Sequence, residues 1–90
     1  MYSRNVLVQN RTGLHARPAT EFISLANEYQ SKITIRLASE EDAVNAKSIM
    51  LLLSIGIGQG DEIVITANGE DETAAVDALV ALVESKFGEE

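Results

Sequence analysis

Hydrophobic side chains alternate with polar ones over three segments of the chain. The alternation covers Tyr2 to Gln9, Lys32 to Leu37 and Asp61 to Ala67. Because successive side chains of a strand point to opposite faces, each segment is predicted to be a strand with one buried face. In the first segment this alternation places Val6 and Val8 together on one face.

Two turn regions are predicted from composition. The acidic segment Ala38 to Asp42 follows the second strand, and a short return strand is expected over Ala43 to Asn45. Later in the chain, Gly56, Gly58 and Gly60 stand close together. Glycine favours the backbone conformations that end helices and form turns, so these residues are expected to close a helix and lead into the last strand.

Three further segments carry hydrophobic residues at helical spacing. The first helix is expected from Ala16, with its apolar stripe between Ala19 and Tyr29, and Pro18 suits its first turn, where a missing N–H costs nothing. A short apolar helix is predicted over Ser48 to Leu53. A closing helix follows, with an apolar stripe that runs from Ala74 to Phe87. Its acidic start and Lys86 near its end match the helix dipole.

The predicted order of elements is therefore β-α-β-β-α-β-α within a single domain, residues 1–90. Half-polar strands imply a sheet with one covered face, so the helices are expected to pack on one side of it. The expected fold is an α/β (α+β) open-faced two-layer sandwich.

Charge and composition narrow the possible functions. The 90 residues carry a net charge of −7 and contain no cysteine. A strongly acidic chain repels phosphate backbones, so nucleic acid is not an expected partner. No apolar run approaches the roughly 20 residues that span a bilayer, so membrane insertion is not expected. The lack of cysteine suits a reducing compartment, and a cytoplasmic location is predicted.

Common metal-binding and nucleotide-binding patterns are missing from the sequence. A single histidine and no cysteine exclude zinc sites of the Cys/His type. Ser39 to Ala43 lacks the pattern of a calcium loop, and Gly56 to Asp61 precedes a strand, whereas nucleotide loops open a helix. We therefore expect no metal and no cofactor.

The remaining candidate for chemistry is the segment Gly13 to Pro18, which contains His15 and Arg17. His15 directly precedes a helix N-terminus, where unpaired N–H groups and the helix dipole stabilise an anion. An imidazole can carry a group covalently, and the guanidinium group of Arg17 is suited to phosphate oxygens. Arg11 lies just before this segment, in the loop predicted over Asn10 to Gly13 after the first strand. A histidine at a helix start is also a common surface residue, so these residues alone leave both interpretations open.

At these positions the chain resembles the histidine-containing phosphocarrier (HPr) family of the bacterial phosphoenolpyruvate:sugar phosphotransferase system. The segment from Asn10 to Ala19, with Gly-Leu-His-Ala-Arg-Pro at its centre, is similar to the family's active-site region. Asn45 to Met50 resembles its regulatory-serine region, and Gly56 to Gly69 resembles its last turn and strand. The resemblance covers essentially the whole chain and implies four antiparallel strands with three helices on one face.

The resemblance implies a stoichiometric carrier, not an independent enzyme. In the family, Enzyme I passes a phosphoryl group from phosphoenolpyruvate to the histidine Nδ1, and the carrier hands it to an EIIA domain of a sugar permease. His15 is then the expected phosphoryl acceptor, and Arg17 is expected to stabilise the phosphate. A monomer suits such a shuttle.

Ser48 corresponds to a serine that an HPr kinase/phosphorylase phosphorylates in many members, with a transcriptional regulator as a further partner. A serine at this position is equally suited to cap the short helix. Phosphorylation would add about two negative charges beside an apolar surface, which is expected to disturb docking. The predicted docking residues are Thr20, Ile49, Met50, Leu51 and Leu53.

The branch of the family stays open. Lys47 to Met50 favours the sugar branch, whereas the acidic turn Ala38 to Asp42 and the tail Ser85 to Glu90 resemble the nitrogen-branch paralogue. The alternatives are therefore a nitrogen-branch or purely regulatory carrier, and a docking module that acts through phosphorylated Ser48.

Overall fold

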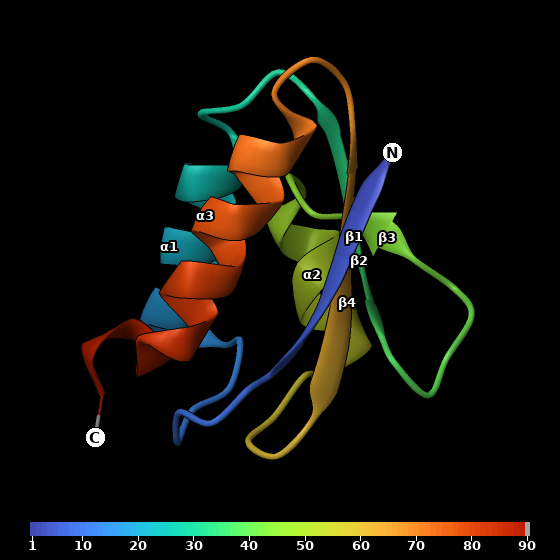
Figure 1. Cartoon of the computed structure of the whole chain (residues 1–90). Coiled ribbons are helices and arrows are strands. Elements are labelled where there is room, and N and C mark those ends of the chain that lie inside the picture. The colour runs from blue at the N-terminus through green and yellow to red at the C-terminus, as the bar shows by residue number, and fades with distance from the viewer. Residues whose placement is uncertain (90) are drawn as a thin grey trace.

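The computed structural model of the chain describes residues 1–89, so Glu90, the last residue of the acidic tail, lies outside the described part (Figure 1). Seven principal elements follow one another in the predicted order, and a 3-10 turn follows the last helix. In chain order they are β1 (Tyr2–Leu7), α1 (Ala16–Ala26), β2 (Lys32–Leu37), β3 (Val44–Asn45), α2 (Ile49–Ile55), β4 (Glu62–Asn68), α3 (Glu72–Glu84) and the turn Lys86–Gly88.

The four strands form one antiparallel sheet in the order β1-β4-β2-β3. All three helices lie on the same face of this sheet, and the opposite face is left uncovered (Figure 1). This arrangement confirms the open-faced two-layer sandwich. It also explains why the strands alternate, because only one of their faces meets the helices.

The core lies between the sheet and the helices. Val6 and Val8 are buried as their spacing predicts, whereas Leu7 between them is 45 % exposed. The central strands contribute a larger set of buried side chains, and the long helices cover them. These residues include Ile33, Ile35, Ile63, Ile65, Phe22, Leu79 and Val83.

The end of the closing helix differs from the prediction. α3 stops at Glu84, and the next turn contains Lys86 and Phe87 in the left-handed region, with φ of 58° and 54°. Phe87 is still only 4 % exposed, because the kinked turn folds its ring back onto the core. Periodicity therefore predicted a buried Phe87 correctly and a continuous helix wrongly. Lys86 does not lie in the last turn of α3, so the predicted dipole match at that end is also wrong.

Smaller differences concern other element boundaries. β1 ends two residues early, at Leu7, and β4 runs one residue later than expected at both ends. The short helix α2 continues to Ile55 and ends at Gly56, whose φ of 72° is the left-handed C-cap expected of glycine. In residues 1–89, no helix has the length and apolar character needed to cross a membrane.

Candidate functional site

His15 is the N-cap residue of α1. Its backbone is extended, with φ −131° and ψ 162°, and its side chain is partly exposed and makes no capping hydrogen bond to the helix. Ala16, the first helical residue, has φ of 53°. A left-handed conformation is energetically costly for a residue other than glycine. The backbone changes direction between the extended His15 and the helix, and Ala16 adopts this conformation at the change. His15 therefore lies at the N-terminus of α1 with a partly exposed side chain.

The first turn of α1 provides an anion-binding environment next to this imidazole. Helix geometry leaves the N–H groups of Ala16 and Arg17 without an acceptor in the helix, and Pro18 has no N–H to leave unpaired. The Arg17 side chain is 71 % exposed and forms an ion pair with Glu21, one turn along the helix, at 3.4 Å. An exposed pair of this kind is weak, so the guanidinium group remains available to an incoming phosphoryl group.

The loop before His15 is fixed by the segment that follows α2. The Leu14 N–H donates to the Ile57 carbonyl oxygen at 3.1 Å, and the Leu14 side chain is fully buried. Gly13 has φ of 66°, and a Cβ there would lie 2.5 Å from the Ile57 oxygen and 2.7 Å from Gly58 Cα. The backbone at Gly13 therefore touches the backbone at Ile57 and Gly58. This close contact fixes the position of the loop that leads to His15.

Asn10 stabilises the same loop from inside. Its side chain is fully buried, and its Nδ2 donates to the Gly13 carbonyl oxygen at 2.9 Å and to Thr12 Oγ1 at 3.3 Å. Within residues 1–89, Asn10 Oδ1 has no hydrogen-bond partner. The sequence identified Asn10 as part of a loop and of the segment that resembles the family's active-site region, but its burial was not predicted, because no local pattern distinguishes a buried asparagine from an exposed one.

The C-terminal tail also reaches the site. Glu89 accepts hydrogen bonds from the Thr12 hydroxyl at 2.8 Å and the Thr12 N–H at 3.4 Å. The Thr12 hydroxyl lowers the pKa of the Glu89 carboxyl, and the positive charge of Arg17 lowers it further. The residues are 77 positions apart, so sequence reasoning had no signal for this contact.

Ser48 is the N-cap of α2, and its hydroxyl accepts a hydrogen bond from the Leu51 N–H at 3.3 Å. The predicted capping role is confirmed. The His15 loop contacts Ile57, which follows the C-terminal end of α2, whereas Ser48 lies at the N-terminal end of that helix.

The predicted docking residues are exposed as expected. Leu52 is the one fully buried residue of α2, whereas Met50 is 80 % exposed and three neighbours are partly exposed. Thr20 is exposed one turn beyond Ala16, and its hydroxyl donates to the Ala16 carbonyl oxygen at 3.4 Å. We use the name α2 patch for Ile49, Met50, Leu51 and Leu53. No cluster of metal-ligating side chains occurs among residues 1–89.

Comparisons with known proteins agree with this geometry. A family model described as the PTS HPr component phosphorylation site matches residues 2–85. Phosphocarrier protein NPr of Proteus mirabilis is 42 % identical over 97 % of this chain and 96 % of its own length. The HPr-like protein Crh of Halalkalibacterium halodurans is 43 % identical over 96 % of this chain and 100 % of its own length.

Solved structures give the same result. The crystal structure of HPr-C-His from Thermoanaerobacter tengcongensis has a TM-score of 0.94 and 46 % identity, and the match covers 100 % of this chain and 99 % of that one. A crystal structure of an HPr dimer from the same organism has a TM-score of 0.74, with coverage of 99 % and 100 %. Identities of 42, 43 and 46 % are too similar to separate the branches.

Proposed function

The chain belongs to the HPr family of phosphocarrier proteins of the phosphotransferase system, and we propose that it accepts a phosphoryl group on His15 from Enzyme I and passes it to EIIA domains of sugar permeases. The observation that carries the proposal is the placement of His15 as the N-cap of α1, with Arg17 two residues away. A partly exposed imidazole beside free helix N–H groups suits a group that has to be received and released.

The chemistry is a phosphoryl transfer from a donor atom of Enzyme I to a nitrogen of His15. A lone pair of the imidazole, at Nδ1 by resemblance to the family, attacks phosphorus as the bond from phosphorus to the donor atom breaks. The donor keeps the electron pair of that bond. The N–H groups of Ala16 and Arg17 and the guanidinium group balance the charge of the phosphoryl oxygens. Because these contacts are exposed, they hold the group without enclosing it. In the onward transfer, an acceptor atom of EIIA attacks phosphorus as the bond to Nδ1 of His15 breaks, and the imidazole keeps the electron pair of that bond.

We propose the α2 patch and Thr20 as the surface that docks these partners. Three observations support this: Met50 is 80 % exposed, further apolar side chains accompany it, and the Leu14 to Ile57 hydrogen bond joins the end of α2 to the His15 loop. Exposed apolar side chains beside a reactive group are typical of an interface.

Phosphorylation of Ser48 by an HPr kinase/phosphorylase is the regulatory part of the proposal. The new charge would lie at the start of α2, next to Ile49, where the helix N-terminus tolerates it. The helix would persist while docking on the α2 patch weakens, and a transcriptional regulator is a candidate reader of the phosphate. The Crh and NPr relatives make a regulatory or nitrogen-branch carrier the alternative function.

The test is intact-mass analysis after incubation with Enzyme I, phosphoenolpyruvate and Mg²⁺. We expect one added phosphoryl group that is labile in acid and is lost in His15→Ala. Cooperative unfolding of that variant is the control for its fold. An unmodified chain, in a reaction where a reference HPr is phosphorylated, would contradict the proposal.

A second step separates the branches. The phosphorylated chain is mixed with a sugar-permease EIIA or with its nitrogen-branch counterpart, and the transfer rates are compared. Faster transfer to the sugar EIIA is the expected result, and the opposite preference favours the nitrogen branch.

We further propose that the carrier acts in the cytoplasm, where phosphoenolpyruvate is formed, and as a monomer, because each partner in turn needs the same surface. The HPr dimer from Thermoanaerobacter tengcongensis makes a dimer the alternative. Light scattering of the phosphorylated and unphosphorylated chain distinguishes the two states.

A further inference from the structure

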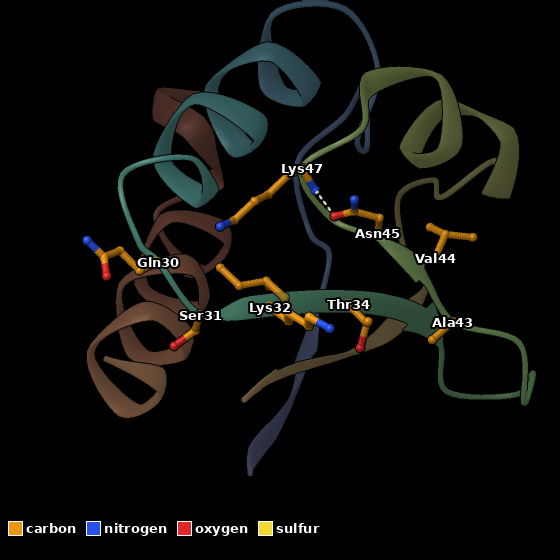
Figure 2. Close-up of a pocket in the computed structure, with 9 residues that line it drawn as sticks. Gln30, Ser31, Lys32, Thr34, Ala43, Val44, Asn45 and Lys47 are labelled. Carbon is orange, nitrogen blue, oxygen red and sulfur yellow. Dashed lines mark hydrogen bonds between the residues drawn. The ribbon is translucent and has the colours of Figure 1, made fainter. Parts of the chain in front are cut away.

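A cavity of about 360 Å³ opens between the start of β2 and the segment that carries β3 (Figure 2). Its position is distinct from the His15 site. Gln30 and Ser31 at its edge follow the C-terminal end of α1, whereas His15 precedes the N-terminal end of the same helix. An α-helix of 11 residues separates the two regions by about 16 Å.

Two lysines contribute the charge of this cavity. Lys32 comes from β2, and Lys47 comes from the segment between β3 and α2. The Lys47 ammonium donates to the Tyr29 carbonyl oxygen at 2.6 Å, which uses one of its three donors. In the described part of the chain neither lysine forms a salt bridge, and none of the residues that line the cavity is acidic.

The positive charge at this cavity contrasts with the negative net charge of the whole chain. The chain has 14 acidic residues and 7 basic ones, yet two of the basic residues line the same cavity. The nearest carboxylate that the structure ties to the cavity is Asp71, which accepts hydrogen bonds from Gln30 and Ser31 at its edge. Positive charge in a concave site raises the local concentration of anions and strengthens its own interaction with them.

Neutral groups complete a binding site of mixed character. Thr34 and Asn45 are directly opposite each other in the β2–β3 pair, so their side chains share one face. Asn45 Oδ1 accepts a hydrogen bond from the backbone N–H of Lys47 at 2.9 Å, drawn as the dashed line in Figure 2. Within residues 1–89 the side-chain amide nitrogen of Asn45 donates no hydrogen bond, so it can serve as a donor to a ligand. Ala43 and Val44 add apolar lining. The volume lies at the small end of the range for ligand pockets.

We propose that this cavity binds a small organic dianion. Its carboxylate or phosphate oxygens pair with the ammonium groups of Lys32 and Lys47 and accept hydrogen bonds from Thr34 and Asn45. Two positive charges at the cavity match a dianion better than a single carboxylate. The apolar lining requires a carbon skeleton, which inorganic phosphate lacks.

The test uses amide chemical shifts of the full chain during titration with malate in one arm and glycerol 3-phosphate in the other. Sodium chloride at matched ionic strength is the control for screening. We expect saturable shifts at the amides of residues 31–34 and 44–47 in at least one arm. The arm that saturates at the lower concentration identifies the anionic group.

Two variants that each remove one positive charge test whether binding depends on the cavity and not on the net charge of the chain. Lys32→Gln removes an exposed lysine of the cavity that is not part of the hydrophobic core. It is expected to weaken binding about tenfold, the effect of losing one charge-assisted hydrogen bond. Lys86→Gln removes the same charge near the end of α3 and is expected to leave affinity unchanged.

Three results would overturn the proposal: shifts that never saturate, equal weakening by both variants, or saturable shifts confined to residues 13–17. The last result would place the anion at the phosphoryl site. It would leave the proposed carrier function intact, so the two proposals fail independently.

Discussion

Ser31 donates two hydrogen bonds to Asp71, one from its N–H at 3.0 Å and one from its hydroxyl group. The Gln30 N–H adds a third, at 2.8 Å, to the other carboxylate oxygen. Ser31 is buried, and a Cβ on Gly69 would lie only 2.8 Å from its Cα. One carboxylate therefore ties the loop after α1 to the start of α3, at the end of the molecule opposite His15.

The Asp71 contacts predict an acid-dependent loss of stability. The Ser31 hydroxyl, followed by the Gln30 N–H, lowers the pKa of the Asp71 carboxyl from its ordinary value of 3.8, against a smaller opposing effect of burial. Because the folded pKa lies below the unfolded one, the stabilisation is complete above the unfolded pKa. It is lost as pH falls through the folded pKa. Thermal unfolding from pH 7 to pH values below 3.8 measures this loss.

Asp71→Asn should have a lower unfolding midpoint than the wild type at pH 7, and the difference should shrink in acid. Asp42→Asn, in the exposed turn after β2, is the control for removal of one charge. A constant difference between Asp71→Asn and wild type at every pH would show that the carboxylate charge is not responsible.

Gly13→Ala is expected to destabilise the fold more than Gly56→Ala, although both glycines have φ near 70°. A Cβ on Gly56 meets nothing within 4 Å, so only the left-handed backbone penalty of about 1 kcal/mol applies there. At Gly13 the Cβ also collides with backbone atoms, for a total of about 2–4 kcal/mol. Urea unfolding measures both values, and equal losses would refute the close contact at Gly13.

Arg17→Ala is expected to slow phosphoryl transfer from Enzyme I by about 10- to 1,000-fold, the usual effect of removing one donor to a charged transition state. Its unfolding midpoint should barely change, because the side chain is mostly exposed. Glu21→Gln is the matched control, since it removes the Arg17 ion pair but leaves the guanidinium group. Stopped-flow or quench kinetics with unchanged transfer in Arg17→Ala would remove this residue from the site.

Ser48→Ala is expected to lower the free energy of unfolding by about 1 kcal/mol, because the Leu51 N–H loses its capping acceptor. Ser48→Asp keeps an acceptor at the N-cap and should retain most of the stability while weakening Enzyme I binding. Ser39→Asp adds the same charge in an exposed turn and should bind normally. Isothermal calorimetry with Enzyme I decides the matter: equal affinity for Ser48→Asp and wild type would place the start of α2 outside the interface.

Met50→Ser is expected to weaken Enzyme I binding without changing thermal stability, since this side chain packs against little of its own molecule. Leu52→Ala, two residues away on the buried side of α2, should cost about 2–5 kcal/mol of stability. Affinity and melting curves for both variants separate docking from packing. Full Enzyme I affinity in Met50→Ser would argue against the α2 patch.

Sequence periodicity predicted those features that depend on neighbouring residues. The burial of Val6 and Val8 beside an exposed Leu7 follows from the two-residue repeat of a strand. The exposure of most of α2 follows from its length, because a helix of seven residues with five leucines, isoleucines or methionines in succession has more apolar side chains than one face can bury.

Features that depend on distant residues escaped prediction. The sequence does not reveal that the helix ends before Ser85, because Phe87 is buried even though it lies beyond the kink. The apolar repeat therefore looks continuous. The carboxylates of Asp71 and Glu89 contact residues 40 and 77 positions away. At the site itself, the motif is the basis for the roles proposed for His15 and Arg17, but the left-handed backbone of Ala16 is visible only in three dimensions.

Only Leu52 of α2 is buried, so the packing of the core constrains this helix at one position. The other positions of the helix are constrained by whatever binds their exposed side chains. Substitutions at the exposed positions of this helix change what other proteins encounter and leave the free energy of unfolding almost unaltered. The His15 loop has no such freedom, because Gly13 and Leu14 are packed against Ile57 and Gly58. Under the proposed function, one copy of a duplicated gene can therefore diverge toward new recipients through the α2 patch, while both copies keep the phosphoryl chemistry proposed for His15.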